Sequence, residues 1–129
     1  MIYTRDIQQR ALISVVDDDV SSRESLPDFL QTLGFAAMSF ASAEDFLASD
    51  VLAVTQCLML DVSMPGMSGP QLQCELRRRG LKIPIIFITG HCDKDLRADL
   101  LARGAVECLI KPFSEQDLRS ALECVVGTA

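Results

Sequence analysis

Side chains that could take part in chemistry end four short apolar runs of this sequence. They are Asp17, Asp18 and Asp19 after the first run, Asp61 after the second, Thr89 at the end of the third and Lys111 after the fourth. Two carboxylates 4 Å apart repel by about 4 kcal/mol at an effective dielectric constant near 20, so such a group needs a cation. Oxygen ligands with room for water favour Mg²⁺, or Mn²⁺ in its place, over zinc. The residues therefore predict a divalent metal site.

Each of these side chains can be given a part in that site. We predict that Asp18 and Asp61 bind the ion directly, that Asp17 binds it through water, and that Ser63 supplies its backbone carbonyl. An aspartate beside such an ion can attack phosphorus if the charge on the phosphoryl oxygens is neutralised, and Asp61 is the predicted nucleophile. The ammonium of Lys111 and the hydroxyl of Thr89 would donate to the resulting acyl phosphate.

The elements that must position these groups can be read from the apolar runs. Three runs are mainly apolar and predict strands buried on both faces: Leu12–Val16, Cys57–Leu60 and Ile85–Thr89. Phe35–Phe40 alternates and Val106–Ile110 carries a charged residue, so both suit the edges of a sheet.

Helical patterns separate these strands. Leucines repeat at helical spacing before Gly34, Gly80 and Gly104, while Ser42 and Ser114 stand where a helix would begin. Asp19 is expected to cap the first of these helices, and Pro70 suits the first turn of the third. Pro27 predicts a kink in the first helix, because a proline inside a helix removes a hydrogen bond.

Alternation of strands and helices indicates an α/β fold in which a parallel sheet has helices on both faces. In such a sheet the reactive groups gather at the carboxyl ends of the strands, where the strand order reverses. All four chemical segments end strands, so the topology brings them to one edge. We expect one domain over residues 1–129, with a core at about 12–125 and a lead-in at 1–11.

Composition narrows the classes of partner. The formal charge of −6 argues against direct binding to nucleic acid or to an anionic membrane. No apolar run approaches the roughly 20 residues that span a bilayer, and the polar start does not resemble a secretion signal, so we expect a cytoplasmic protein. Five cysteines without C-x-x-C spacing are expected to be reduced and without metal.

Four motifs in register give the sequence a family resemblance. They are V-V-D-D-D, L-D-V-S-M-P-G-M-S-G, I-T-G-H and K-P-F. From about Leu12 to Val125 the chain resembles a receiver domain of bacterial two-component response regulators, and looks most like the receivers of LuxR-type transcriptional regulators of the nitrogen-fixation or nitrate type. The resemblance implies a flavodoxin-like three-layer sandwich: a doubly wound, five-stranded parallel sheet in the order 2-1-3-4-5.

The resemblance also implies a function. Such a domain takes a phosphoryl group from a sensor histidine kinase onto Asp61 in a Mg²⁺-dependent reaction, and it is not an enzyme beyond its own phosphorylation and dephosphorylation. The Lys111–Pro112 peptide would be cis. A homodimer or an output partner would use the face of the fourth helix, fifth strand and fifth helix, roughly Asp95 to Val126.

Two departures from the family pattern leave alternatives open. Receivers usually carry an aromatic residue three positions before the lysine, and here Cys108 stands there. A pseudo-receiver that binds proteins without phosphorylation is therefore the alternative function. The chain contains no output domain, so it is either a stand-alone receiver or a part of a longer regulator.

Two other classes fit the residues less well. A phosphatase of the haloacid dehalogenase type needs an aspartate where Ser63 stands, and a flavin module would not place aspartates beside the flavin phosphate. His91 is expected to be solvated. Arg77, Arg78 and Arg79 are expected to complement a helix dipole, not to bind nucleic acid.

Overall fold

Five parallel strands alternate with helices in the computed structural model, which describes residues 10–91 and 93–126. The strands are β1 (Leu12–Val16), β2 (Ala36–Phe40), β3 (Cys57–Asp61), β4 (Ile85–Thr89) and β5 (Glu107–Ile110). The helices are α2 (Val20–Thr32), α3 (Ala43–Leu47), α4 (Gly69–Arg78), α5 (Lys94–Ala102) and α6 (Glu115–Val126), with a 3₁₀ turn η1 at Leu52–Val54. Most of the predicted lead-in, residues 1–9, lies outside the described part.

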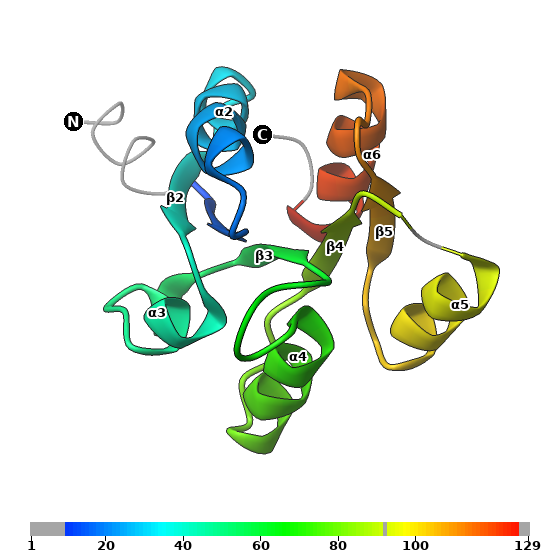
Figure 1. Ribbon diagram of the computed structural model, residues 1–129. Helices are drawn as coiled ribbons and strands as arrows, with labels where there is room; N and C mark the ends of the chain where they lie inside the picture. The colour runs from blue at the N-terminus through cyan, green and yellow to red at the C-terminus, as the bar shows by residue number, and fades with distance from the viewer. Residues whose placement is uncertain (1–9, 92, 127–129) are drawn as a thin grey trace.

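The strand order is β2-β1-β3-β4-β5, as predicted, with β2 and β5 at the edges. Helices α2 and α6 cover one face of the sheet and α3, α4 and α5 cover the other (Figure 1). The order reverses between β1 and β3, so the chain segments that leave these neighbouring strands at their carboxyl ends run to opposite faces of the sheet. None of the described helices is long and apolar enough to cross a membrane.

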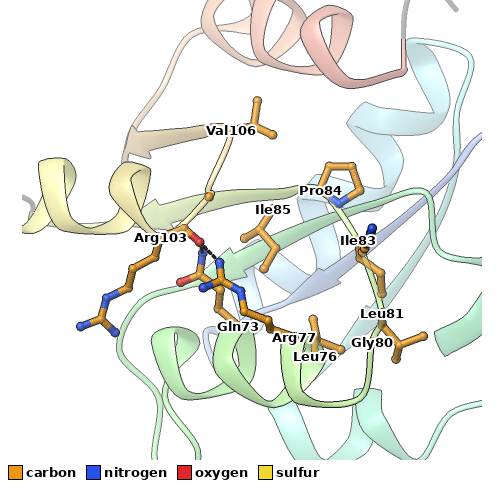
Figure 2. Close-up of a pocket in the computed structure, with 12 residues that line it drawn as sticks. Gln73, Leu76, Arg77, Gly80, Leu81, Ile83, Pro84, Ile85, Arg103 and Val106 are labelled. Atoms are coloured by element: carbon orange, nitrogen blue, oxygen red, sulfur yellow. Dashed lines mark hydrogen bonds between the residues drawn. The ribbon is translucent and has the colours of Figure 1, made fainter.

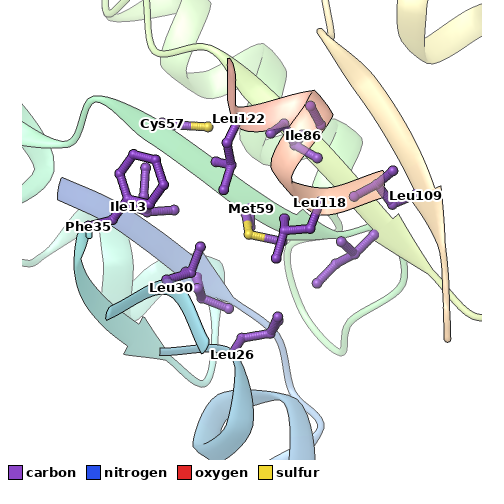
Figure 3. Packing of buried hydrophobic residues seen from close by; sticks show 13 residues of the cluster. Ile13, Leu26, Leu30, Phe35, Cys57, Met59, Ile86, Leu109, Leu118 and Leu122 are labelled. Atoms are coloured by element: carbon purple, nitrogen blue, oxygen red, sulfur yellow. The ribbon is translucent and has the colours of Figure 1, made fainter. Parts of the chain in front are cut away.

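Alternating side chains of the central strands fill two apolar layers. Along β3, Cys57 and Met59 pack toward α2 and α6, while Leu58 and Leu60 pack toward the other helices. Figure 3 shows the first layer, in which Leu26 and Leu30 of α2 and Leu118 and Leu122 of α6 belong to one apolar cluster over the sheet. A strand buried on both faces explains why β1, β3 and β4 read as continuous apolar runs.

Polar side chains fix the starts of the helices. Asp19 caps α2, Ser42 caps α3, and Ser114 accepts a hydrogen bond from the Asp117 amide near the start of α6, all as expected. Ser68 caps α4 in a capping box with Gln71, which the sequence reading overlooked. Helix α2 continues through Pro27 to Thr32, so this proline does not end the helix, and the kink stays a prediction.

Candidate functional site

Three carboxylates meet at the carboxyl ends of β1 and β3. Ligand oxygens of Asp17, Asp18 and Asp61 all lie within 4.8 Å of one another. Asp17 is fully buried, Asp61 is 8% exposed and Asp18 is exposed to solvent. Asp17 and Asp61, 44 positions apart in the sequence, thus lie together as predicted, because β1 and β3 are neighbours in the sheet. Carboxylates that offer oxygens at these separations match the donor set that Mg²⁺ takes.

Lys111 forms an ion pair with the buried Asp17. Its Nζ lies 2.7 Å from Asp17 Oδ2, and the Asp19 amide donates to Oδ1 at 2.9 Å. Burial alone would raise the pKa of Asp17, but the hydrogen bond from Lys111 and that from Asp19 outweigh it, so this pKa lies below its usual value. Asp17 is therefore charged, with both oxygens already hydrogen-bonded, which suits a ligand that reaches the ion through water.

The pKa of Asp61 is shifted in the opposite direction, above its usual value. Burial and, next, the negative charge of Asp17 raise the pKa of its carboxyl to about 7, and Lys111 offsets only a part of this rise. The Ser63 amide donates weakly to Asp61 Oδ1 at 3.4 Å. Burial and the neighbouring negative charge both disfavour the ionised form of Asp61, and a bound cation would stabilise that form. The electrostatics of Asp61 therefore favour metal binding.

This raised pKa predicts how metal-free stability depends on pH. Below about pH 4 Asp61 is protonated in both states; between about pH 4 and 7 the unfolded chain releases the proton while the folded protein keeps it, so stability falls as pH rises. The fall should amount to about 2–4 kcal/mol and be complete above pH 7. Urea unfolding in EDTA at pH 4.5 and 7.5 measures it.

The Asp61→Asn variant is the control for this pH dependence. It should lack the fall and melt above the unmutated protein at pH 7.5 without metal, and Asp18→Asn should also raise the melting temperature. Mg²⁺ should stabilise the unmutated protein most at pH 7.5. Parallel pH profiles for the unmutated protein and Asp61→Asn would show that the pKa of Asp61 is not raised in the folded protein.

Thr89 lies at the carboxyl end of β4 and is 6% exposed. Its hydroxyl donates to the His91 carbonyl at 2.9 Å and accepts from the His91 amide at 3.3 Å. In this state the hydroxyl is thus bound to the loop between β4 and α5. His91 is exposed, as expected, and both of these hydrogen bonds to Thr89 are made by the His91 backbone.

The segment around β5, which leads to Lys111, differs from the family pattern at one side chain. The Lys111–Pro112 peptide is cis, as the resemblance implied. Cys108 is buried and packs in the apolar layer that also contains Phe87 and Leu100. A cysteine here is too small to reproduce an aromatic side chain that moves between an inner and an outer position.

Two contacts around the site were missed from the sequence. Arg23 of α2 donates to the backbone carbonyl of Asp17 at 3.0 Å. Glu44 of α3 accepts from the Met67 amide at 3.1 Å, in the loop that follows Asp61. Neither spacing follows a helical or strand period, so no pattern in the sequence could have signalled these contacts.

A cavity of about 460 Å³ lies at the opposite end of the sheet. Figure 2 shows Gln73 and Arg77 of α4 reaching the backbone carbonyl of Arg103, and both donate hydrogen bonds to it. Ile85 and Val106, at or just before the starts of β4 and β5, form part of the wall. The cavity is lined by none of the strand-end carboxylates, so it is not the predicted site.

The predicted role of the arginine run can be compared with these contacts. Arg78 and Arg79 form ion pairs with Glu75 at 2.6 and 2.7 Å, and Arg77 and Arg78 lie in the last turn of α4 as expected. Their partners lie within the domain, which agrees with a structural role.

Comparison with known proteins identifies the family. Residues 13–123 match the response regulator receiver domain. The chain belongs to this family. The receiver domain is 44% identical over 113 residues to nodulation protein W of Bradyrhizobium diazoefficiens, a match that covers 88% of this chain and 50% of that protein. It thus spans about half the length of the curated relatives that it matches.

Solved structures agree with this assignment. The response regulator StyR superposes with a TM-score of 0.83 at 42% identity, over 91% of this chain and 59% of that one. The structure described as FixJ-N gives 0.80 at 36% identity, over 89% and 92%. The predicted fold, the resemblance and the general function of a two-component receiver are confirmed, and no relative supports the pseudo-receiver.

Proposed function

We propose that this receiver domain takes a phosphoryl group from a sensor histidine kinase onto Asp61, with Mg²⁺ or Mn²⁺ held in the acidic cluster. Asp18 and Asp61 would bind the ion directly, Asp17 through water, and Ser63 through its backbone carbonyl. The cluster of three carboxylates within 4.8 Å carries the proposal, because it supplies an accepting oxygen and a cation site in one place. The ion would neutralise charge on the phosphoryl oxygens.

The chain's own residues supply the remaining parts of the transfer. An Asp61 carboxylate oxygen attacks phosphorus, the bond between phosphorus and the imidazole nitrogen of the kinase breaks, and the electron pair stays on that nitrogen. Lys111 is 2.7 Å from Asp17 before the reaction, so its ammonium must turn to reach the new phosphoryl oxygens. Thr89 must exchange its hydrogen bond to the His91 carbonyl for one to the phosphoryl group.

The exchange at Thr89 gives the signal a route to the surface. When the hydroxyl leaves His91, the loop before α5 loses two hydrogen bonds and a second conformation gains population. The face of α5, β5 and α6 would then bind an output partner or a second copy. We also propose that residues 1–129 form a single domain and that this domain is not an enzyme beyond its own phosphorylation and dephosphorylation. We expect it to act in the cytoplasm and to make no direct contact with nucleic acid or membrane.

Acetyl phosphate provides a kinase-free test. Incubation with Mg²⁺ and acetyl phosphate, followed by intact-mass measurement, should show the gain of one phosphoryl group that is absent from Asp61→Asn. EDTA should prevent the gain. A modification that survives in Asp61→Asn would contradict the assignment of the acceptor, and no modification in any condition would favour the pseudo-receiver.

A further inference from the structure

The loop between β3 and α4 joins the predicted nucleophile to a helix that begins eight residues later. Its ends are fixed within the site itself: the Val62 amide donates to the Ile88 carbonyl at 3.1 Å, and the Gly69 amide donates to the Val62 carbonyl at 3.0 Å. Between these ends lie Ser63, which is predicted to bind the metal ion through its carbonyl, and the turn at Gly66. The position of that carbonyl thus depends on what holds the middle of the loop.

One side chain from another element holds it. Glu44 Oε2, in the first turn of α3, accepts from the Met67 amide at 3.1 Å. For residues 64–67, no other hydrogen bond to a different helix or strand is seen in the part of the chain that the structure describes. An amide bonded to a carboxylate is a charge-assisted hydrogen bond, which is stronger than one between neutral groups.

Gly66 provides a second observation of the loop against Glu44. Its φ is +75°, a conformation that favours glycine, and a Cβ there would lie 2.9 Å from Glu44 Oε2. The carboxylate therefore occupies the space that any other residue at this position would fill. Backbone shape and close approach both fit a loop seated against Glu44.

We infer that Glu44 is a positioning residue for the phosphorylation site: it seats the loop so that the Ser63 carbonyl and Asp61 can bind the metal ion together. The inference rests on the proposed function. It assigns Glu44 no contact with metal or phosphorus, and its effect passes through the Met67 amide.

Glu44→Ala removes the acceptor, whereas Glu44→Gln keeps an amide oxygen that can accept the same hydrogen bond. The alanine variant should bind Mg²⁺ and react with acetyl phosphate about threefold to tenfold more weakly or slowly, the range expected for one lost hydrogen bond. The glutamine variant should stay near the unmutated protein. Asp45→Ala, which removes an equal charge from the same turn of α3 at an exposed position, is the matched control and should have no effect.

Amide exchange of Met67, measured without metal, reports the contact itself. Exchange should quicken in Glu44→Ala and not in Asp45→Ala. A double-mutant cycle adds a second test: Gly66→Ala should weaken Mg²⁺ binding by itself, and its effect should be smaller when Glu44 is already alanine, because the 2.9 Å contact is then gone.

The results separate this inference from the function on which it rests. Faster Met67 exchange with unchanged Mg²⁺ affinity would overturn the positioning role, and so would equal losses in Glu44→Gln and Glu44→Ala. If the unmutated protein neither binds Mg²⁺ nor gains a phosphoryl group, the proposed function fails and the inference fails with it. The inference is supported if Glu44→Ala binds Mg²⁺ more weakly and its Met67 amide exchanges faster, while Glu44→Gln and Asp45→Ala behave like the unmutated protein.

Discussion

Replacing Gly69 with alanine should be among the most damaging single changes in this domain. A Cβ at Gly69 would lie 2.3 Å from the backbone carbonyl oxygen of Asp61 and 3.1 Å from the Cα of Val62, distances at which atoms overlap. Alanine is the better helix former by about 1 kcal/mol, but the overlap is with backbone, which cannot turn away as a side chain can. We expect a loss of about 3 kcal/mol or more and a melting temperature about 10 °C lower.

The same substitution should also weaken metal binding, because the backbone that must shift belongs to Asp61. Gly90→Ala is the matched control: nothing lies within 4 Å of a Cβ there and its φ is not positive. Thermal unfolding and Mg²⁺ titration of both variants make the comparison. Equal melting temperatures for Gly69→Ala and Gly90→Ala would mean that the close packing of α4 on β3 is wrong.

Lys111→Met should destabilise the protein nearly as much. It leaves the fully buried Asp17 without its cation while Asp61 remains beside it. Breaking a buried ion pair by removing one partner costs about 3–5 kcal/mol, and since the Lys111 side chain is 25% exposed we expect about 2–3 kcal/mol at pH 7. Urea unfolding without metal, beside Lys82→Met as the control at an exposed lysine, measures the loss.

The pH dependence of this loss identifies its cause. In the unmutated protein Asp17 has a lowered pKa, so it contributes stability above its unfolded pKa and loses it as pH falls through the folded value. Without Lys111 that contribution is gone, so the free energies of unfolding of the unmutated protein and Lys111→Met should become similar in acid. Asp17→Asn should recover much of the loss in the Lys111→Met background, because the amide carries no charge. If the loss of stability did not change with pH and was not reduced by Asp17→Asn, its cause would be lost packing and not the unpaired charge.

The sheet was well predicted because its central strands are buried on both faces. Leu12–Val16 and Ile85–Thr89 match β1 and β4, while the edge strands β2 and β5 each begin one residue later than predicted. A strand covered by helices on both sides is apolar along nearly all of its length, which marks its ends clearly. An edge strand is covered less completely, so its sequence marks its limits less sharply.

The site could be predicted as a set of residues but not as a network of contacts. Asp17, Asp18 and Asp61 were expected to meet, since parallel strands bring their carboxyl ends to one edge. Which carboxylate is deepest depends on side-chain direction at the strand end, and the sequence does not encode that locally. The pairing of Lys111 with Asp17 and the bond from Thr89 to His91 likewise follow from the folded loops.

The ion pair between Asp17 and Lys111 joins positions 94 residues apart in the chain. During synthesis the first strand and its acidic end emerge early, and the ammonium that neutralises them emerges only with the last strand. A nascent chain that stops before Lys111 has three carboxylates to gather and lacks the ammonium that pairs with Asp17. Assembly of this pocket is therefore a late event in the making of the protein, and its competence to receive a signal arises only when the last strand has joined the sheet.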